Sequence, residues 1–403
     1  MRDNSVLTRL ATGLLVVACL PGGLRAEGFR NAPEGARAIG AFGGYRAFAD
    51  DATAVIHNPA NLVDFDGPEV QVSLLSGYAR TRFRSSEGER DRTDDPFFMI
   101  PGIAAVVPVP DTRAAVGLAL YIPYGRGVEW PRDGYFAQRG LPYAGSMMVA
   151  DLTPNAAVQV TDSLSVALGA DLYYGRVHQD TLLIGLEPLG IPNGTRSRIE
   201  ADGQSAGWNA AATWQATARQ RLALTYRSPF SIRYTGDNTL SIGMQSDVSA
   251  RIHYPTIVGA AYGVALTDTL RAEINGEWLE FSRYETLTLN DSVFGPQVFP
   301  QNLKDTWTAG IGVQWQFQPE WTLRSGYKYV KNPTPDATYG PLSPDEDQGV
   351  IALGIGYANA RHAIDAAWAY GIFDGRTIPD SNPAGGRYTY DVQLLSVSYS
   401  LKL

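Results

Sequence analysis

The sequence of 403 residues has almost no cysteine and no long hydrophobic run. Its one cysteine, Cys19, has no second thiol with which to form a disulfide or a zinc site. The longest apolar run, residues 10–20, is about half of the ~20 residues that a helix needs to cross a bilayer. The sequence therefore excludes a helical membrane protein, and any crossing of a membrane would have to be made by strands.

Signs of catalytic chemistry are also missing. The histidines, His57, His178, His253 and His362, are scattered and lack the spacing of a metal site. No nucleophile elbow, phosphate loop or dinucleotide fingerprint occurs. A hydrolase built from one serine and one histidine on neighbouring strands leaves no such signature, and it stays an alternative. We expect no enzyme activity, no cofactor and no metal.

Charge is sparse and predominantly negative. Charged residues make up 18% of the chain, below the roughly 25% of a typical soluble domain. The 33 basic and 41 acidic residues give a net charge of −8. Because nucleic-acid binding needs basic patches, this balance argues against a nucleic-acid partner.

The first residues have the features of an export signal. Positive charge at Arg2 and Arg9 precedes the apolar run, and a small residue, Ala26, offers a cleavage site. We therefore assign residues 1–26 to a cleaved signal peptide. The alternative is a lipoprotein, because the Val-Val-Ala that precedes Cys19 resembles a site at which the cysteine is acylated.

Apolar and polar residues alternate from about Glu69 to the end of the chain. This pattern is typical of strands whose two faces meet different surroundings. Between Trp307 and Phe317, for example, every second residue is apolar and the residues between are small or polar. Fourteen such strands are predicted, at residues 69–84, 97–109, 112–124, 145–161, 163–182, 203–217, 219–236, 248–265, 268–290, 304–317, 320–332, 347–358, 361–373 and 387–403.

The predicted connections alternate in length. Short turns, such as Pro110-Asp111 and Gln318-Pro319, alternate with polar loops, such as residues 125–144 and 183–202. Short periplasmic turns and long outer loops are typical of outer-membrane barrels, whereas a soluble sandwich, the alternative fold, does not need this asymmetry. Because unpaired backbone groups are costly in hydrocarbon, we predict that the sheet closes.

Aromatic residues recur near the predicted strand ends and fit girdles at the two membrane interfaces. They are Tyr78, Tyr121, Trp208, Tyr226, Trp278, Trp315, Trp321 and Tyr399. The predicted fold class is therefore all-β, a transmembrane antiparallel β-barrel that occupies residues 69–403.

Residues 27–68 do not alternate. They are rich in glycine, alanine and charge, and they end in Asn58-Pro59-Ala60 and a short tail. We predict short helices here, which either hang in the periplasm or plug the barrel as a hatch.

The order of several motifs resembles the FadL/TodX-type family of outer-membrane transporters. The motifs are Asp50-Asp51 before Asn58-Pro59-Ala60, then Tyr124-Gly125, Glu129-Trp130, Leu224–Pro229, Lys304–Trp307, Trp321–Tyr327 and Tyr399–Leu401. The resemblance implies a fourteen-stranded barrel plugged by a hatch. It also implies uptake of long-chain fatty acids or, in other members, of monoaromatic hydrocarbons. Substrate would be captured at the outer loops, enter an apolar pocket and leave sideways at a kink in the third strand.

The resemblance also gives roles to individual residues. Phe29 would reach into the ligand pocket, and Asp50, Asp51, Asn58, Pro59 and Ala60 would form the hatch signature. Tyr124 and Gly125 would lie at the kink, although Gly125 could also be an ordinary loop start. Candidate cations for a carboxylate head group are Lys304, Arg324 and Lys328, which have luminal parity, and Arg176, which alternation turns outward. The alternative is that these cations balance acidic residues of the lumen or the hatch.

The expected location is the bacterial outer membrane. The expected partners are its lipid bilayer, an apolar small molecule and the barrel-assembly machinery. The chain departs from most barrels by ending in Leu403 rather than in an aromatic residue. A structural or adhesive barrel, whose hatch never opens, is the second functional hypothesis.

Overall fold

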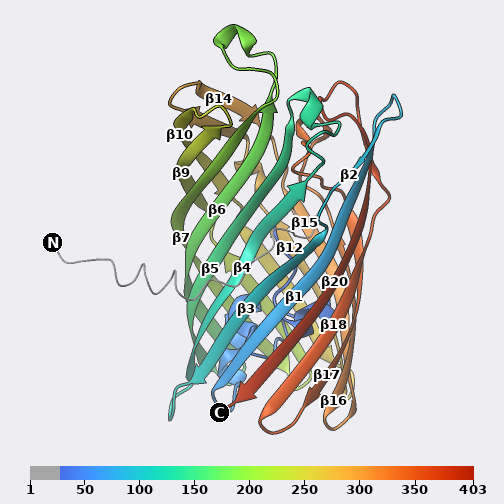
Figure 1. Ribbon diagram of the computed structural model, residues 1–403. Helices are drawn as coiled ribbons and strands as arrows, with labels where there is room; N and C mark the ends of the chain where they lie inside the picture. The colour runs from blue at the N-terminus through green and yellow to red at the C-terminus, as the bar shows by residue number, and fades with distance from the viewer. Residues whose placement is uncertain (1–27) are drawn as a thin grey trace, which may run out of the picture.

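Residues 28–403, which the computed structural model describes, form a closed sheet of fourteen antiparallel wall strands (Figure 1). Ten wall strands are continuous: β1 (Glu69–Arg84), β3 (Phe97–Pro108), β4 (Ala114–Glu129), β5 (Pro142–Thr161), β6 (Leu164–Leu183), β7 (Thr195–Thr217), β16 (Trp321–Val330), β17 (Gln348–Ala358), β18 (His362–Ile372) and β20 (Gly386–Lys402). Four are interrupted: β8 (Gln220–Arg227) with β9 (Phe230–Leu240), β10 (Gln245–Tyr254) with β11 (Ile257–Ala265), β12 (Leu270–Leu279) with β13 (Thr286–Asp291), and β14 (Gly295–Pro300) with β15 (Thr306–Gln318). The barrel closes because β20 pairs with β1.

Short elements decorate the loops. They are β2 (Arg90–Arg92), β19 (Arg376–Ile378), η2 (Ala137–Arg139), η3 (Glu187–Leu189), η4 (Phe281–Arg283) and η5 (Asp336–Thr338). The predicted signal peptide, residues 1–26, lies outside the described residues.

The predicted fold class and the number of strands are confirmed. On β15, for example, Trp307, Ile311 and Trp315 are exposed on the outer face, whereas Thr306 and Thr308 are buried on the inner one. This alternation follows from the pleat of the strand, which points successive side chains to opposite faces.

Several predicted strands differ in detail from the structure, among them the one expected at 268–290, which is interrupted between Leu279 and Thr286. The strand expected at 219–236 is interrupted at Ser228-Pro229, and the one expected at 248–265 is interrupted at Pro255-Thr256. Proline has no N–H to donate to a neighbouring strand, so the pairing stops there. Strands also continue beyond the predicted ends, since β4 reaches Glu129 and shortens the loop that was expected to begin at residue 125.

The outer wall presents apolar and aromatic side chains to lipid. Trp208 and Trp278 are 49% and 41% exposed, as expected for an interfacial girdle. The assignment of Tyr121 to the girdle is wrong, because this side chain is buried and faces the lumen. Its ring lies 5.8 Å from the guanidinium carbon of Arg227, which holds the tyrosine on the polar inner side.

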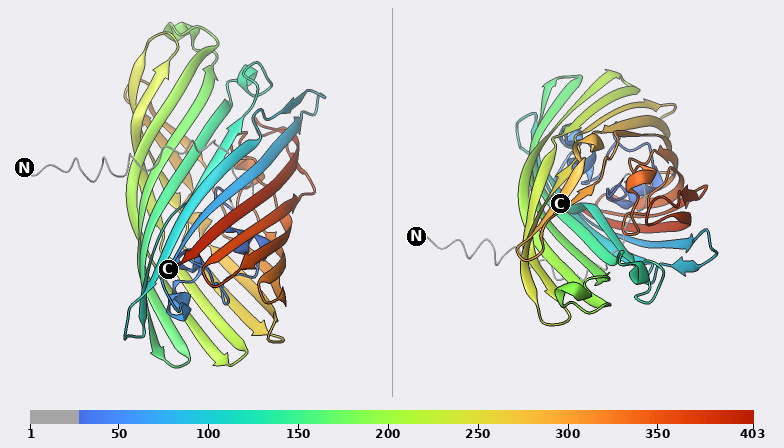
Figure 2. Two further views of the ribbon diagram at one scale, coloured as in Figure 1. Left: turned by 60° about the horizontal axis from the view of Figure 1, so that its bottom comes forward. Right: turned by 90° about the horizontal axis from the view of Figure 1, so that it is seen from above.

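The segment before the barrel folds back into the lumen as a hatch, which is residues 28–68 throughout this article. It contains α2 (Ala36–Gly40), α3 (Ala54–His57) and η1 (Pro59–Asp64). Seen from above, this blue segment lies inside the ring of strands (Figure 2). No helix within residues 28–403 is long and apolar enough to cross a membrane.

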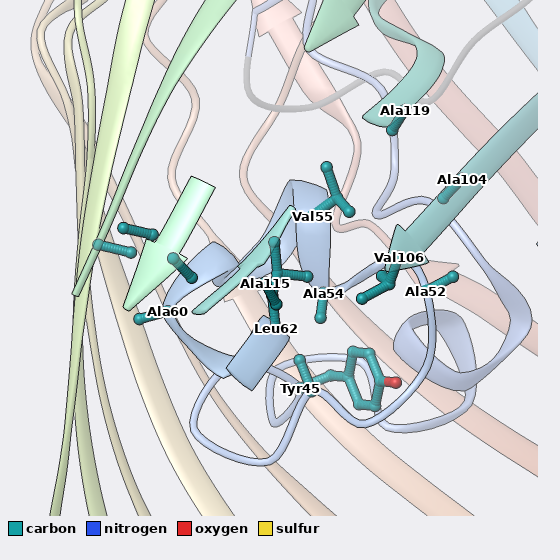
Figure 3. Close-up of a cluster of buried hydrophobic side chains, with 14 of the residues drawn as sticks. Tyr45, Ala52, Ala54, Val55, Ala60, Leu62, Ala104, Val106, Ala115 and Ala119 are labelled. Carbon is teal, nitrogen blue, oxygen red and sulfur yellow. The ribbon is translucent and has the colours of Figure 1, made fainter. Parts of the chain in front are cut away.

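Small side chains allow the hatch to dock closely on the wall. Ala54, Val55 and Leu62 of the hatch pack against Ala104 of β3 and Ala115 of β4 (Figure 3). All five are almost fully buried. Alanine on the wall leaves space into which the larger hatch side chains fit, so the contact is densely packed.

Glycine provides a second docking surface on the opposite part of the wall. A Cβ added to Gly44 would lie 2.3 Å from the backbone nitrogen of Gly312 on β15, and one added to Gly40 would lie 3.0 Å from the Cα of Gly354 on β17. Backbone therefore meets backbone, and no larger residue fits at these positions. This contact fixes the middle of the hatch to the wall.

Candidate functional site

The wall is locally unzipped between β3 and β4. Their pairing runs only from Pro108 opposite Ala115 to Ile103 opposite Leu120. Beyond that point the register of β4 with β5 on its other side also shifts between Tyr121 and Tyr124. A shift of this kind is a β-bulge, which bends the strand away from its neighbour.

The first described residues of the hatch occupy the free edge of β4. The N–H of Asn31 donates to the carbonyl of Pro123 at 2.9 Å, and the N–H of Gly125 donates to the carbonyl of Phe29 at 3.0 Å. Arg30 forms an antiparallel bridge with Tyr124. Residues 29–31, which we call the arm, therefore satisfy backbone groups that the neighbouring strand leaves unpaired.

Gly125 lies within β4, and the alternative of an ordinary loop start is wrong. A Cβ on this residue would lie 2.9 Å from Nδ2 of Asn31, whose side chain donates to the carbonyl of Ile122 at 2.8 Å. The glycine is needed for close approach of the arm. The sequence placed Tyr124 and Gly125 at a kink, and the structure places both at the bent, unzipped edge.

Phe29 lies at the centre of an aromatic cluster. Its ring centroid is 5.8 Å from that of Tyr124, 5.4 Å from that of Tyr254, 5.3 Å from that of Phe281 and 6.3 Å from that of Tyr284. Further buried members of the cluster are Val149, Tyr173, Phe230, Ile232, Tyr234, Ile257, Leu279 and Leu303. The cluster adjoins the unzipped edge and fills this part of the lumen with apolar side chains.

Most members of this aromatic cluster could not be predicted from the sequence. Tyr254, Phe281 and Tyr284 lie at interruptions of wall strands, where alternation no longer tells the inner face from the outer one. A weak signal does exist, because each of the three follows or precedes a break in the period-two pattern. Phe29 alone was assigned to the pocket beforehand.

A buried carboxylate, Glu277 of β12, gathers cations from the hatch and the wall. Arg30 donates to it from two nitrogens at 2.8 and 3.0 Å, and Arg46 donates at 2.5 Å. Lys328 of β16 lies 3.3 Å away. Three cations therefore converge on one carboxylate beside the aromatic cluster.

A cavity of about 110 Å³ lies between the hatch and the wall. Arg30, Arg46, Glu277 and Lys328 line it together with Tyr124. The cavity thus connects the charge cluster to the unzipped edge. Arg227 also lines the cavity, so an anion entering it would meet several cationic side chains.

The other candidate cations have different surroundings. Arg324 faces the lumen, as its parity predicted, and donates to Asp365 at 2.7 Å. Arg176 is exposed on the outer face, 4.0 Å from Glu200. Lys304 lies in the connection before β15, so strand parity does not apply to it; it is exposed and makes no ion pair within residues 28–403.

The Asn-Pro-Ala box organises the hatch, and its Pro59 also lines the cavity. Nδ2 of Asn58 donates to the carbonyl of Arg46 at 3.0 Å and to the hydroxyl of Thr213 at 2.7 Å, while its Oδ1 accepts from the N–H of Ala60 at 3.3 Å. Pro59 begins η1, where its missing N–H costs nothing. The box therefore ties the loop, the helix and the wall strand β7 together.

The two acidic residues of the hatch signature, Asp50 and Asp51, make different contacts. Asp51 is buried and accepts from the N–H and the hydroxyl of Thr53 at the start of α3. Asp50 is 40% exposed and lies 3.0 Å from Arg37 and 3.3 Å from Arg271 of β12. Both carboxylates fix the hatch, because one orders its helix and the other attaches it to the wall.

Glu34 places a titratable group against the wall beside the unzipped edge. It accepts from the hydroxyl of Ser73 on β1 and lies over Gly102 of β3. Burial raises the pKa of Glu34 from an ordinary value of 4.5 to about 7. The protonated form is therefore the one that the docked hatch favours.

We expect docking of the hatch to weaken as the pH rises. The stabilising effect of a raised carboxyl pKa is fully present below ~4.5 and is lost as the pH rises to about 7, a change on the order of 3 kcal/mol. Protection of hatch amides from hydrogen exchange, corrected for intrinsic rates, should fall between pH 4.5 and about 7. Glu34→Gln should remove this dependence, and an unchanged dependence in that variant would contradict the assignment.

Comparison with known proteins agrees with this geometry. Residues 17–402 match the model of the outer membrane protein transport protein (OMPP1/FadL/TodX) family. The long-chain fatty acid transport protein of Escherichia coli O6:H1 (strain CFT073) is 25% identical over 379 residues, which cover 82% of this chain and 83% of that protein. Outer membrane protein P1 of Haemophilus influenzae is 24% identical over 420 residues, 90% of this chain and 88% of that protein.

Solved structures share the fold. A Pseudomonas aeruginosa FadL homologue superimposes with a TM-score of 0.81 at 21% identity, over 93% of this chain and 99% of the other. The toluene transporter TodX of P. putida superimposes with a TM-score of 0.75 at 16% identity, over 92% of this chain and 99% of the other.

A hatch-bearing barrel with these relatives is an outer-membrane transporter of hydrophobic compounds. The chain belongs to the OMPP1/FadL/TodX family of outer membrane transport proteins. The predicted location in the outer membrane is confirmed.

Proposed function

We propose that the protein takes up long-chain fatty acids, which are captured at the outer loops, enter the aromatic cluster and leave sideways between β3 and β4. The observation that carries the proposal is the arm, which closes an unzipped part of the wall with three residues. Displacing the arm would join the cluster to the surrounding lipid. An apolar solute gains about 0.8 kcal/mol per buried CH₂, so such a route spares it a return through water.

Phe29 would act as a removable plug of the binding pocket. Its side chain occupies the middle of the aromatic cluster and belongs to the same arm that covers the wall. A ligand that replaces the ring would also pull on the backbone of Arg30 and Asn31. Binding of substrate and opening of the wall would then be one event.

Positive charge near the cluster supports a carboxylate ligand. Lys328 and the arm residue Arg30 lie beside Glu277, and Lys304 adjoins Leu303 of the aromatic cluster. Arg324 contributes less to this proposal, because it pairs with Asp365 and does not line the cavity, and Arg176 contributes least, because it is exposed on the outer face. The head group would sit where the apolar and the charged parts of the lumen meet.

Titration of the purified protein with oleate, and separately with toluene, tests the proposal. We expect saturable oleate binding that weakens in Lys304→Ala. Phe29→Ala should bind about tenfold to a hundredfold more tightly, because the ligand no longer has to displace a buried ring worth about 1.5–3 kcal/mol. Phe317→Ala, which removes an exposed ring of β15, is the matched control and should bind like the parent protein.

The alternatives give different outcomes in the same titration. Binding of toluene alone would assign the protein to monoaromatic hydrocarbons, which the compact aromatic cluster also suits. Binding of neither compound would contradict transport and favour a structural or adhesive barrel. Export through the cleaved signal peptide at residues 1–26 and insertion by the barrel-assembly machinery belong to the proposal in every case.

A further inference from the structure

Five exposed arginines face outward at the outer end of the barrel, where β1, β2 and β20 lie side by side (Figure 1). They are Arg82 and Arg84 of β1, Arg90 and Arg92 of β2, and Arg387 of β20, and we call them the arginine patch. Arg82 lies opposite Arg92. Arg84 lies opposite Arg90 on one side and opposite Arg387 on the other.

The protein itself leaves this charge uncompensated. Like charges directly opposite on neighbouring strands destabilise a sheet. Among residues 28–403, no carboxylate forms an ion pair with any arginine of the patch. Two acidic residues of the same hairpin have other partners, because Glu89 pairs with Arg139 and Asp91 accepts from the N–H of Tyr135. Glu87 at the hairpin tip is exposed and forms no ion pair among the described residues. In a chain of net charge −8, such a concentration of positive charge points to an external anion.

The height of the patch restricts which anion can reach it. On the same strand, Tyr78 packs against Phe97 with ring centroids 5.3 Å apart, and the residues below, Val72 and Leu74, are exposed and apolar. This aromatic pair marks the membrane–water interface. With a rise of ~3.3 Å per residue and a strand tilt of ~40°, Arg82 and Arg84 lie about 10 and 15 Å beyond it.

Phospholipid headgroups do not extend so far. Their layer adds only about 5–8 Å on each side of the hydrocarbon core. A glycolipid with a large phosphorylated sugar headgroup does extend to this height, and such a glycolipid, lipopolysaccharide, forms the outer leaflet of this membrane. Guanidinium groups bind phosphate through two parallel hydrogen bonds, which suits arginine better than lysine.

We propose that the arginine patch binds phosphate groups on the sugar headgroup of outer-leaflet lipopolysaccharide. The arginines of the patch lie on three neighbouring strands, which are ~4.8 Å apart, so the patch can contact more than one phosphate of the same headgroup. Bound phosphate would cancel the repulsion across the pairs of β1 with β2 and with β20. The glycolipid would thereby hold together the seam at which the first and the last wall strands meet.

Binding of rough lipopolysaccharide that keeps its phosphorylated core sugars to the detergent-solubilised protein, purified from outer membranes, tests the proposal. In the variant Arg84→Gln/Arg90→Gln we expect at least tenfold weaker binding, and binding by the parent protein should weaken with added salt. The matched control is Arg113→Gln/Arg219→Gln, which removes two exposed arginines from periplasmic turns, where each pairs with an aspartate. This control should bind like the parent protein.

Further measurements test whether phosphate on the sugar headgroup is what the patch binds. The same glycolipid with its phosphates removed should bind at least tenfold more weakly. Equal binding of the phosphate-free form, or of bilayer discs of phosphatidylglycerol, would overturn the proposal, and so would unchanged binding in Arg84→Gln/Arg90→Gln. Heat-modifiable migration in gels shows that each variant has folded. Arg84→Lys/Arg90→Lys keeps the charge, and its affinity should fall between that of the parent protein and that of Arg84→Gln/Arg90→Gln.

Discussion

A disulfide between the arm and β4 is expected to abolish uptake under oxidising conditions. The double variant Asn31→Cys/Gly125→Cys would place one sulfur on each side of the contact, since a Cβ on Gly125 lies 3.6 Å from Cγ of Asn31. The sulfur of a cysteine at position 31 would lie near the position of that Cγ, close enough to a sulfur on residue 125 for an S–S bond of ~2.05 Å. Because the proposed exit requires the arm to leave this edge, the lock should stop transport almost completely.

Uptake of radiolabelled oleate by cells that carry only the variant gene measures this effect. Addition of a reductant should restore uptake, because the bond then opens while both substitutions stay in place. The single variants Asn31→Cys and Gly125→Cys control for the substitutions themselves. Transport at the parental rate by a demonstrably oxidised double variant would exclude exit between β3 and β4.

Loss of the carboxylate at Glu277 is expected to release the hatch from the wall. In Glu277→Gln, the cations of Arg30, Arg46 and Lys328 stay buried without their counter-charge. Removing one partner of a buried ion pair costs about 3–5 kcal/mol, and here the hatch can avoid that cost by undocking. The barrel should remain folded, because its strand pairing does not depend on this residue.

Hydrogen exchange resolved along the chain measures the effect. Amides of residues 28–66 should lose protection by two orders of magnitude or more, since each 1.4 kcal/mol is a factor of ten, whereas amides of β1 and β20 should not change. Glu200→Gln is the matched control, because that carboxylate lies on the outer face of β7 with its side chain 51% exposed. Unchanged hatch protection in Glu277→Gln would show that the glycine and alanine contacts suffice for docking.

The sequence alone was sufficient for the wall of the barrel. Successive side chains of a strand that crosses a bilayer must face lipid and lumen in turn. The outer face of β15, with Trp307, Ile311 and Trp315, could therefore be predicted residue by residue. The same parity placed Arg324 and Lys328 in the lumen. Tyr121 was misplaced because it was assigned from its position near a strand end, although it has the same parity as Ala115 and Ala119, which face the lumen.

The hatch and the site depended on contacts that no local pattern encodes. The motif at Asn58 identified a hatch, but the sequence left open whether it hangs in the periplasm or plugs the lumen. Glu277 lies 247 positions from Arg30 in the sequence, and no sequence pattern predicts that the two residues pair. Tyr254 and Phe281 lie where wall strands break, so their direction was undefined.

Sequence by itself determined the number of wall strands, most of their faces, the closure of the sheet and the family, because lipid on one side of the wall and the lumen on the other impose a period of two on every strand. Tertiary structure alone decided which backbone edge the arm covers, which carboxylate holds the hatch and which arginines stand opposite one another. The physical reason is that each of these depends on register and close approach between segments distant in the chain, and a shift of one residue would send the same side chains to the other face.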